Sequence, residues 1–232
     1  MLPLRDNVPT RTFPAVTISL IAANFVVWFW ELTKPGVDVH VLRDGYYPCS
    51  VSGPCLAPAP PHHLPWYEGA FTGMFMHASW VHILGNMLFL WIFGNNVEDA
   101  LGRVRFLLWY LAAGVVAAGT QTFVTLHFGT THDASIPNIG ASGAIAGVLG
   151  AYIVLLPRAR VLTLIFFFIL REIPAVWFLG IWIALQAWQG GIGLTHPDQT
   201  GGVAVFAHIG GFAFGFLTVN LVKKRSPLQP TW

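Results

Sequence analysis

The stretch ASIPNIGASGAIAGVLGAYIVLLP, residues 134–157, decides the kind of fold because it runs for 24 positions without a charged side chain. A helix needs roughly 20 mostly apolar residues to cross about 30 Å of hydrocarbon, so this stretch is long enough to span a membrane. Gly143 and Gly147 form a G-x-x-x-G pair, which lets membrane helices approach backbone to backbone. We therefore expect a tightly packed transmembrane helix here.

Five other charge-free runs are also long enough to span a membrane: Thr12–Trp30, Gly69–Val97, Phe106–His132, Ile173–Pro197 and Gln199–Val222. Together the six runs predict an all-α membrane protein, a bundle of six transmembrane helices. The expected spans are about 13–30, 72–95, 106–126, 140–157, 173–190 and 202–222, with an outer loop at 31–71. The chain, residues 1–232, is predicted to be a single membrane domain. The shorter run Val161–Leu170 is expected to be interfacial or re-entrant.

The overall composition agrees with a membrane protein. Of 232 residues, 55% are hydrophobic and only 9% are charged, whereas soluble proteins have about 25% charged residues. So few charges could not cover a water-exposed surface. The composition therefore excludes an ordinary soluble domain, a disordered chain and a small disulfide-rich scaffold.

The distribution of basic residues predicts the orientation. Ten of the twelve Lys and Arg residues fall on one side of the expected membrane, and they are Arg5, Arg11, Arg103, Arg105, Arg158, Arg160, Arg171, Lys223, Lys224 and Arg225. Only Lys34 and Arg43, in the long first loop, fall on the other side. Cytoplasmic loops carry the excess of basic residues, so both termini are predicted to be cytoplasmic. We see no basic patch suited to nucleic acid.

The two cysteines, Cys49 and Cys55, lie in the outer loop in the sequence CSVSGPC. In an oxidising compartment they could pair, but their spacing is equally compatible with free thiols. Neither lies in a predicted span, which excludes a thiol nucleophile inside the membrane.

Polar side chains inside the spans are the candidates for function, because such groups are costly in hydrocarbon. No Asp, Glu, Lys or Arg lies well inside a predicted span; Glu98 and Asp99 lie at the inner end of the second. The polar residues that we single out are His77, His82, Asn86, Asn95, Asn96, Gln121, Ser142, Gln186, Gln189 and His208.

The helical spacing of these residues predicts which of them meet. His82 and Asn86 are four residues apart and share a face, whereas His77 is about 140° away from His82 around a continuous helix. His208 falls within one arc of small residues, with Ala204, Ala207, Gly211 and Gly215. The helices at 140–157 and 202–222 are therefore expected to meet along a seam, with Ser142 and His208 on its two sides.

Depth in the membrane sets a condition on this arrangement. If the second span begins near Thr72, His82 and Asn86 lie roughly 15–21 Å along the helix. Ser142 starts its own helix, so the loop before it would have to dip inward to reach them. Irregular backbone at that depth requires a water-filled cavity.

The chemistry follows from the types of side chain. A serine hydroxyl needs a base to become a nucleophile, and His208 is the base across the seam from Ser142. No carboxylate lies in the spans, so the pair would act as a dyad. His82, Asn86 and the Ser142 N–H at a helix N-terminus could donate to an oxyanion. The set predicts acyl transfer and, with water, hydrolysis of a peptide bond.

The chain resembles the rhomboid family of intramembrane serine proteases. The resemblance rests on four motifs in order: FMHASWVHILGNM at 75–87, GNNVED at 94–99, GASG at 140–143, and AHIGG at 207–211 followed by Gly215. These motifs fall on the second, fourth and sixth predicted spans. The Trp-Arg pair that some bacterial members carry in the first loop is absent.

The resemblance implies a role for each site residue. Ser142 would attack the substrate, His208 would act as base and then acid, and His82 and Asn86 would line the oxyanion hole. Neither a metal nor another cofactor is expected. Substrates would be single-span membrane proteins cut near the outer face, entering beside the fifth span under a cap formed by residues 190–201. The implied location is the bacterial inner membrane, with the site opening to the non-cytoplasmic side.

Each residue also has a simpler reading. Ser142 alone could be a packing serine, His208 could bond a backbone carbonyl, and His82 with Asn86 could be an interhelical clamp. We interpret His77 as structural and Gln121 as a plain interhelical hydrogen bond. The aromatic residues of the fifth span, Trp177, Phe178 and Trp182, are interpreted as mostly lipid-facing or interfacial packing and not as specific substrate contacts.

Two other functions also remain open. One is a catalytically inactive rhomboid-like binder of membrane proteins. The other is a metal transporter or metalloenzyme with His77, His82 and His208 as ligands. The 140° offset and the lack of intramembrane carboxylates count against a metal.

Overall fold

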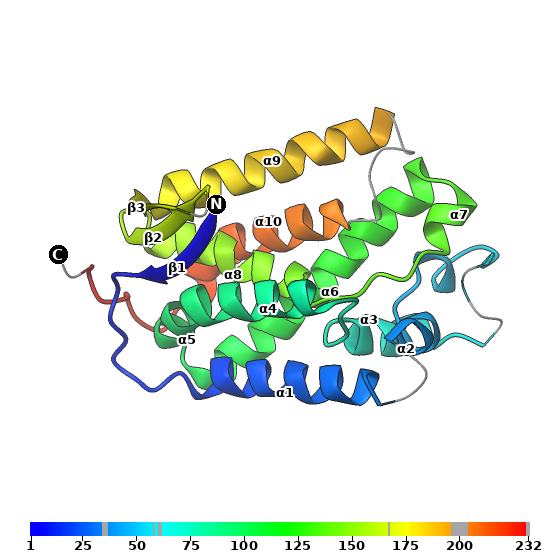
Figure 1. Ribbon diagram of the computed structural model, residues 1–232, viewed down its shortest axis with the longest axis horizontal. Coiled ribbons are helices and arrows are strands. Elements are labelled where there is room, and N and C mark those ends of the chain that lie inside the picture. Colours follow the sequence, from blue (N-terminus) through cyan, green and yellow to red (C-terminus); the bar gives the residue numbers. More distant parts are fainter. Residues whose placement is uncertain (34–36, 58, 60–61, 167, 196–203, 231–232) are drawn as a thin grey trace.

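Long apolar helices dominate the structure, a computed structural model that describes residues 1–33, 37–57, 59, 62–166, 168–195 and 204–230. Within these residues, three helices are long and apolar enough to cross a membrane by length and composition: α6 (Arg103–Phe128), α9 (Ala175–Thr195) and α10 (Val205–Val222). Two more, α1 (Ala15–Glu31) and α8 (Ser142–Leu155), are apolar but shorter. Figure 1 shows α8 and α10 enclosed between α9 on one side and α1 with α4 on the other.

The second predicted span is built differently from a single helix. A short helix, α3 (Trp66–Gly73), is followed by irregular backbone and then by an unbroken helical run made of α4 (Trp80–Phe89), the π-helical turn η2 (Leu90–Gly94) and α5 (Asn95–Leu101). The helix that carries His82 thus begins at Trp80, and a start near Thr72 was wrong. Ser79 explains the boundary because its hydroxyl accepts from the N–H of His82 at 3.2 Å, which is an N-cap.

Short elements and one disulfide organise the loop between α1 and α3 and the loop after α6. They are α2 (Val37–Asp44), the 3-10 turn η1 (Pro48–Ser50) and α7 (Thr131–Ala134). Cys49 and Cys55 are bonded to each other, which decides between the two states that the sequence left open. Cys49 is buried with Tyr47 and Ala134, so the disulfide anchors the outer loop to α7.

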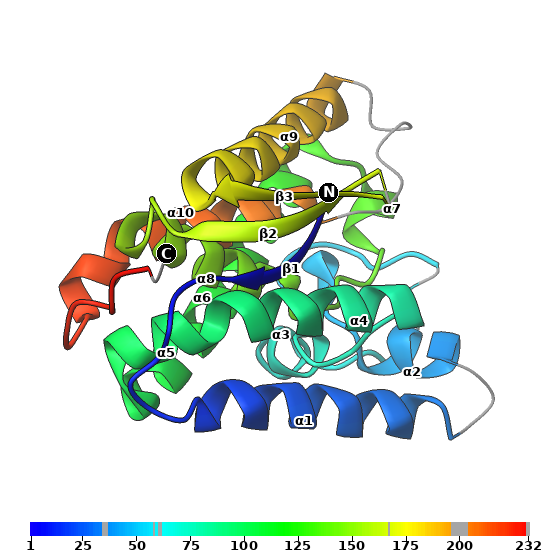
Figure 2. The same cartoon turned by 60° about the vertical axis from the view of Figure 1, so that its left-hand side comes forward.

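A small antiparallel sheet, in the order β1-β2-β3, is the part of the fold that the sequence did not predict. It consists of β1 (Leu2–Asp6), β2 (Arg160–Ile165) and β3 (Ile169–Pro174), and the expectation of purely helical structure is corrected accordingly. The run Val161–Leu170 supplies most of β2 and the start of β3; its buried Val161 and Thr163 alternate with more exposed neighbours, as in a half-buried strand. Figure 2 shows the sheet running beside the beginning of α9.

The seam between α8 and α10 is the tightest packing in the site region and confirms the small-residue pattern. A Cβ on Gly211 would overlap the carbonyl oxygen of Gly143, and a Cβ on Gly215 would overlap that of Gly147. Backbones in such close contact have no space for larger side chains, so glycine is required on this face. The seam brings the beginnings of α8 and α10 together.

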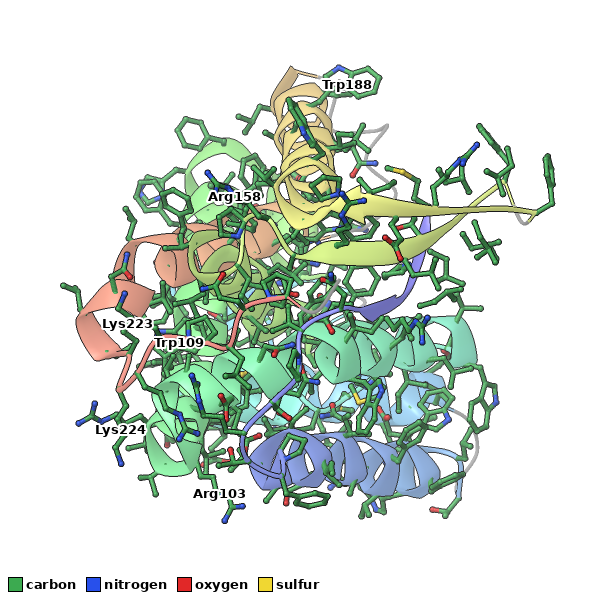
Figure 3. The ribbon with its side chains drawn as sticks, turned by 90° about the vertical axis from the view of Figure 1, so that its left-hand side faces the viewer. Arg103, Trp109, Arg158, Trp188, Lys223 and Lys224 are labelled. Carbon is green, nitrogen blue, oxygen red and sulfur yellow. A yellow bond between two sulfur atoms is a disulfide. The ribbon has the colours of Figure 1, made fainter. Side chains whose placement is uncertain are left out.

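Both chain ends meet at one end of the bundle, which we call the terminal end: residues 1–12, 96–102, 152–165 and 223–226. The Asp99 carboxylate, whose side chain is 2% exposed, accepts from the guanidinium groups of Arg11 and Arg225. Glu98 accepts from the N–H groups of Val16 and Thr17 and so caps α1. Arg103, Arg158, Lys223 and Lys224 surround this end (Figure 3).

Candidate active site

Ser142 is the first residue of α8, and the backbone before it has a conformation that requires glycine. Gly140 has φ +114°, and a Cβ at this position would lie 2.7 Å from Nε2 of His82, so only glycine fits. The N–H of Gly140 donates to the carbonyl of Gly73 at 2.8 Å, which fixes this turn to α3. The first intrahelical bond of α8 joins the Ile145 N–H to the Ala141 carbonyl. The N–H of Ser142 therefore lies at the positive end of the helix dipole.

His208 lies in the first turn of α10, directly across the seam. Its Nε2 is 2.8 Å from Oγ of Ser142, within hydrogen-bond reach. The start of α10 is positioned by Gln121 of α6, whose Oε1 accepts from the N–H groups of Phe206 and Ala207 at 3.0 and 3.2 Å. Gln121 thus makes the interhelical hydrogen bond that its isolation in the sequence suggested, and it satisfies two N–H groups at a helix start.

The other nitrogen of the His208 ring, Nδ1, is 2.7 Å from Oε1 of Gln186 on α9. Trp182, one turn earlier on α9, places its ring 5.8 Å from the His208 ring, between centroids. Sequence reasoning noted Gln186 only as a polar residue in a span and assigned it no role. Two of the aromatic residues expected to face lipid lie inward, because Phe178 is buried and Trp182 packs on His208. Trp177, in contrast, is 66% exposed.

His82 and Asn86 lie on one face of α4, as their spacing predicted, and this face is turned toward Gly140, two residues before Ser142. Because α4 begins only at Trp80, His82 lies in the first turn of the helix, and the expected distance of roughly 15–21 Å along it was wrong. The N–H of Ala78 donates to Nδ1 of His82 in a long bond of 3.5 Å. That bond leaves Nε2 as the protonated nitrogen of the neutral ring, and Nε2 is the atom nearest Gly140.

His77 is the residue whose position the sequence predicted least well. It precedes α4 and is not on it, so the expected 140° offset from His82 does not apply. Its buried ring lies 4.9 Å from that of His82, between centroids, and the amide nitrogen of Asn86 is 3.0 Å from its Nε2. His77 therefore sits behind Asn86 and orients its amide, a contact that continuous helical spacing could not reveal.

A small cavity of about 50 Å³ adjoins the serine. Its lining includes Ser142, Gly140, Gln121 and Tyr46, with α3 on the far side. A water molecule needs roughly 10–15 Å³ of such space and some polar neighbours, so this cavity has room for water beside the hydroxyl. Residues 196–201 of the cap expected at 190–201 lie outside the described residues, as does the expected start of the last span near residue 202, whereas 190–195 belong to the end of α9.

Metal binding by the histidines was the competing idea. Within the described part of the chain, no group of three or more His, Cys, Asp and Glu side chains is arranged to hold a metal ion. His82 and His77 are neighbours, but the two ring nitrogens of His208 lie within hydrogen-bond distance of Ser142 and Gln186. The geometry thus gathers a serine, a histidine base and neutral hydrogen-bond donors.

The sequence model of the Rhomboid domain matches residues 65–225, which include all of these side chains. The chain belongs to the rhomboid family. Among known rhomboid proteins, it is 32% identical to the presenilin-associated rhomboid-like protein A, mitochondrial, of Danio rerio, over 68% of this chain and 39% of that protein. It is 31% identical to the bovine presenilin-associated rhomboid-like protein, mitochondrial, over 92% of this chain and 51% of the relative.

A bacterial rhomboid relative, YdcA of Bacillus subtilis, is 32% identical over 62% of this chain and 63% of its own length. This rhomboid chain therefore spans less than two thirds of each of these three relatives. Bacterial and mitochondrial members match at similar identity, so the family assignment fixes an integral membrane rhomboid and leaves the compartment open.

Proposed function

We propose that this rhomboid is an intramembrane serine endopeptidase that hydrolyses peptide bonds in or near the transmembrane segments of membrane proteins. The observation that carries the proposal is the 2.8 Å separation between Oγ of Ser142 and Nε2 of His208, beside a cavity that can hold water. Nucleophile and base are within reach of each other before any substrate is bound, as acyl transfer requires.

In the proposed reaction, Oγ of Ser142 attacks the carbonyl carbon of the scissile bond while its proton passes to Nε2 of His208. The tetrahedral intermediate collapses when His208 returns that proton to the leaving amine, which leaves an acyl group on Ser142. Water then attacks the ester carbonyl while His208 takes a proton from the water, and His208 returns that proton to Oγ of Ser142 as the bond to the acyl group breaks and the acid product departs. His208 is base and acid in turn, and no cofactor or metal takes part in these steps.

The oxyanion of each intermediate needs hydrogen-bond donors on the side of Gly140. We assign this role to Nε2–H of His82, the amide of Asn86 and the backbone N–H of Ser142. The bond from Ala78 to Nδ1 of His82 supports this assignment because it keeps the proton on Nε2. Preorganised donors of this kind are worth about 2.7–4 kcal/mol each in acyl transfer.

The proposed setting is a single membrane domain, residues 1–232, with six spans and both termini in the cytoplasm. The basic residues around the terminal end support this orientation. The dyad would then open to the non-cytoplasmic side. We propose the bacterial inner membrane as its location and single-span membrane proteins as its substrates; the lipid bilayer is the solvent for both.

Labelling with a fluorophosphonate probe tests the proposal. The purified protein in lipid vesicles is expected to be labelled at Ser142 and to cleave a single-span substrate. Ser142→Ala and His208→Ala should abolish both signals while the protein remains folded. A folded wild-type protein that takes no label and cleaves no membrane substrate would overturn the proposal and favour an inactive binder. Activity that disappears in a chelator would point to a metal instead.

A further inference from the structure

The His208 ring is held from both sides, and only one side is explained by a Ser-His dyad. Nε2 faces Ser142 at 2.8 Å, and Nδ1 faces Oε1 of Gln186 at 2.7 Å. Gln186 comes from α9, a helix that contributes nothing else to the reacting groups. An amide oxygen can only accept a hydrogen bond, so in this geometry Nδ1 carries the proton and Nε2 has its lone pair free for the serine.

We propose that Gln186 is a positioning residue that fixes the tautomer and orientation of His208. This inference rests on the proposed function, since it concerns the base of that reaction. When Ser142 gives its proton to Nε2, the ring becomes an imidazolium with N–H groups on both sides. The amide dipole of Gln186, already aimed at Nδ1–H, then stabilises the positive charge without reorganising.

Aspartate performs this task in soluble serine hydrolases, where it holds the histidine tautomer. Within the described residues, the structure records no hydrogen bond or ion pair between His208 and a carboxylate, and the neighbours of the ring are Gln186, Trp182 and Ser142. A neutral amide avoids the cost of placing a charge at membrane depth and still supplies the acceptor. Gln186 is therefore the third member of the constellation, in neutral form.

The face of α9 that carries Gln186 is the face that contacts α10. Trp182, one turn before, packs on the rings of His208 and Phe212, and Gly190, one turn after, lies against Phe206. Other positions of α9, such as Trp188, are exposed. Because Gln186 and His208 belong to different helices, the bond to Nδ1 exists only while α9 is packed on α10. The position of α9 therefore controls whether the His208 ring has the tautomer and orientation that a base requires.

The test compares three variants: Gln186→Leu, Gln186→Glu and the control Gln189→Leu. The control makes the same change on the same helix at an exposed position. We would measure kcat, KM and the rate of fluorophosphonate labelling in lipid vesicles from about pH 5 to 9, with thermal unfolding as a check of folding. Gln186→Leu is expected to lower kcat by about 10- to 100-fold with KM within twofold of wild type, and Gln189→Leu should match wild type.

Gln186→Glu separates positioning from packing. A carboxylate keeps an acceptor at Nδ1 of His208, so activity should stay within about tenfold of wild type at alkaline pH. The carboxylate also stabilises the protonated ring, so the fall in activity at low pH, which is the acid limb of the pH profile, should move to higher pH. A merely structural glutamine would not move that limb. If Gln186→Leu does not fold, the pH profile of Gln186→Glu is sufficient to test the inference.

Three results overturn the inference: wild-type kcat in folded Gln186→Leu, an unshifted acid limb in Gln186→Glu, or an equal loss in Gln189→Leu. A wild-type protein that neither labels nor cleaves would instead overturn the proposed function, so the two failures are distinguishable.

Discussion

The terminal end of this rhomboid and the region around Ser142 and His208, which we call the dyad end, use opposite kinds of polar contact. At the terminal end, a buried carboxylate, Asp99, binds two guanidinium groups from segments far apart in the chain. At the dyad end, the side-chain contacts that position His208 and the start of α10 come from neutral amides, Gln121 and Gln186. The buried carboxylate is paired with two guanidinium groups that are themselves partly exposed, whereas neutral amides make their hydrogen bonds without the cost of placing a charge in hydrocarbon. Under the proposed function, the terminal end holds the frame and the dyad end performs the chemistry.

The comparison predicts that substitutions at the dyad end reduce activity, whereas substitutions at the terminal end reduce stability. The largest effect is expected for Ser142→Ala, which removes the nucleophile but only one hydroxyl from the packing. Cleavage should fall by about 10⁴-fold or more, while the melting temperature stays within about 2 °C of wild type. Cleavage of a single-span substrate, together with thermal unfolding in detergent, measures both. A variant that loses stability and activity together would contradict a separation of the two ends.

Asp99→Ala should give the reverse pattern. It leaves Arg11 and Arg225 without their shared partner and removes the hydrogen bonds from Thr12. Loss of a buried partner in such a network is expected to cost about 2–4 kcal/mol of unfolding free energy. The rate of fluorophosphonate labelling, measured well below the melting temperature, should stay near that of wild type. Glu98→Gln is a milder control, since an amide oxygen can still cap α1.

Asp6 sharpens the comparison because it makes the stability of the terminal end depend on pH. Its carboxylate accepts from Tyr152 at 2.5 Å and from Asn96 at 2.7 Å, and burial raises the pKa of Asp6 to about 6. A carboxyl group with a raised pKa binds its proton more tightly in the folded state. The contribution of Asp6 to the free energy of unfolding is therefore fully present below its unfolded pKa of 3.8 and is lost as the pH rises through about 6.

Unfolding followed from pH 4 to 7 should thus show a loss of stability of roughly 2–3 kcal/mol from this group. Asp6→Asn keeps an oxygen for both donors but does not titrate, so its profile should be flatter. Identical profiles for the two proteins would rule out Asp6 as the source. Cleavage is expected to follow a separate pH dependence, because it declines when the His208 base is protonated.

The smallest effect is expected from the disulfide. Opening a closed loop of this size costs about 2 kcal/mol in the chain-entropy description. The bond between Cys49 and Cys55 ties the outer loop to α7 and not to either dyad residue. A protein with both cysteines changed to serine should melt slightly lower and be proteolysed faster in the outer loop. Its labelling at Ser142 should change by less than about threefold.

Much of the site was predictable because it depends on local spacing. His82 and Asn86 share a face at any helical position, and the glycines of 140–157 and 202–222 require a close seam, which the structure confirms. The roles of these residues remain predictions. Low charge inside the spans also predicted that the serine and histidine would lack a carboxylate, and the amide of Gln186 takes up the position that a carboxylate would occupy.

The remaining features depend on contacts that spacing does not encode. His77 was set aside because a continuous helix was assumed, whereas the cap at Ser79 starts α4 later and allows His77 to reach Asn86. Gln186 received no role because its partner lies on another helix, 22 positions away. The sheet was missed since β1 has no alternating pattern, and only pairing with β2 makes it a strand.

That pairing has a consequence for how the protein is made. Asp6 of β1 lies opposite Val161 of β2, much later in the chain, and at about 5–20 residues per second a ribosome needs roughly 8–30 s to synthesise the intervening segment. During that time β1 has no strand to pair with, while α1, α4 and α6 have already been synthesised. The sheet therefore closes late, after the helices from α1 to α8 have been made. A bulky tag fused next to β1 is expected to slow this last step of biogenesis.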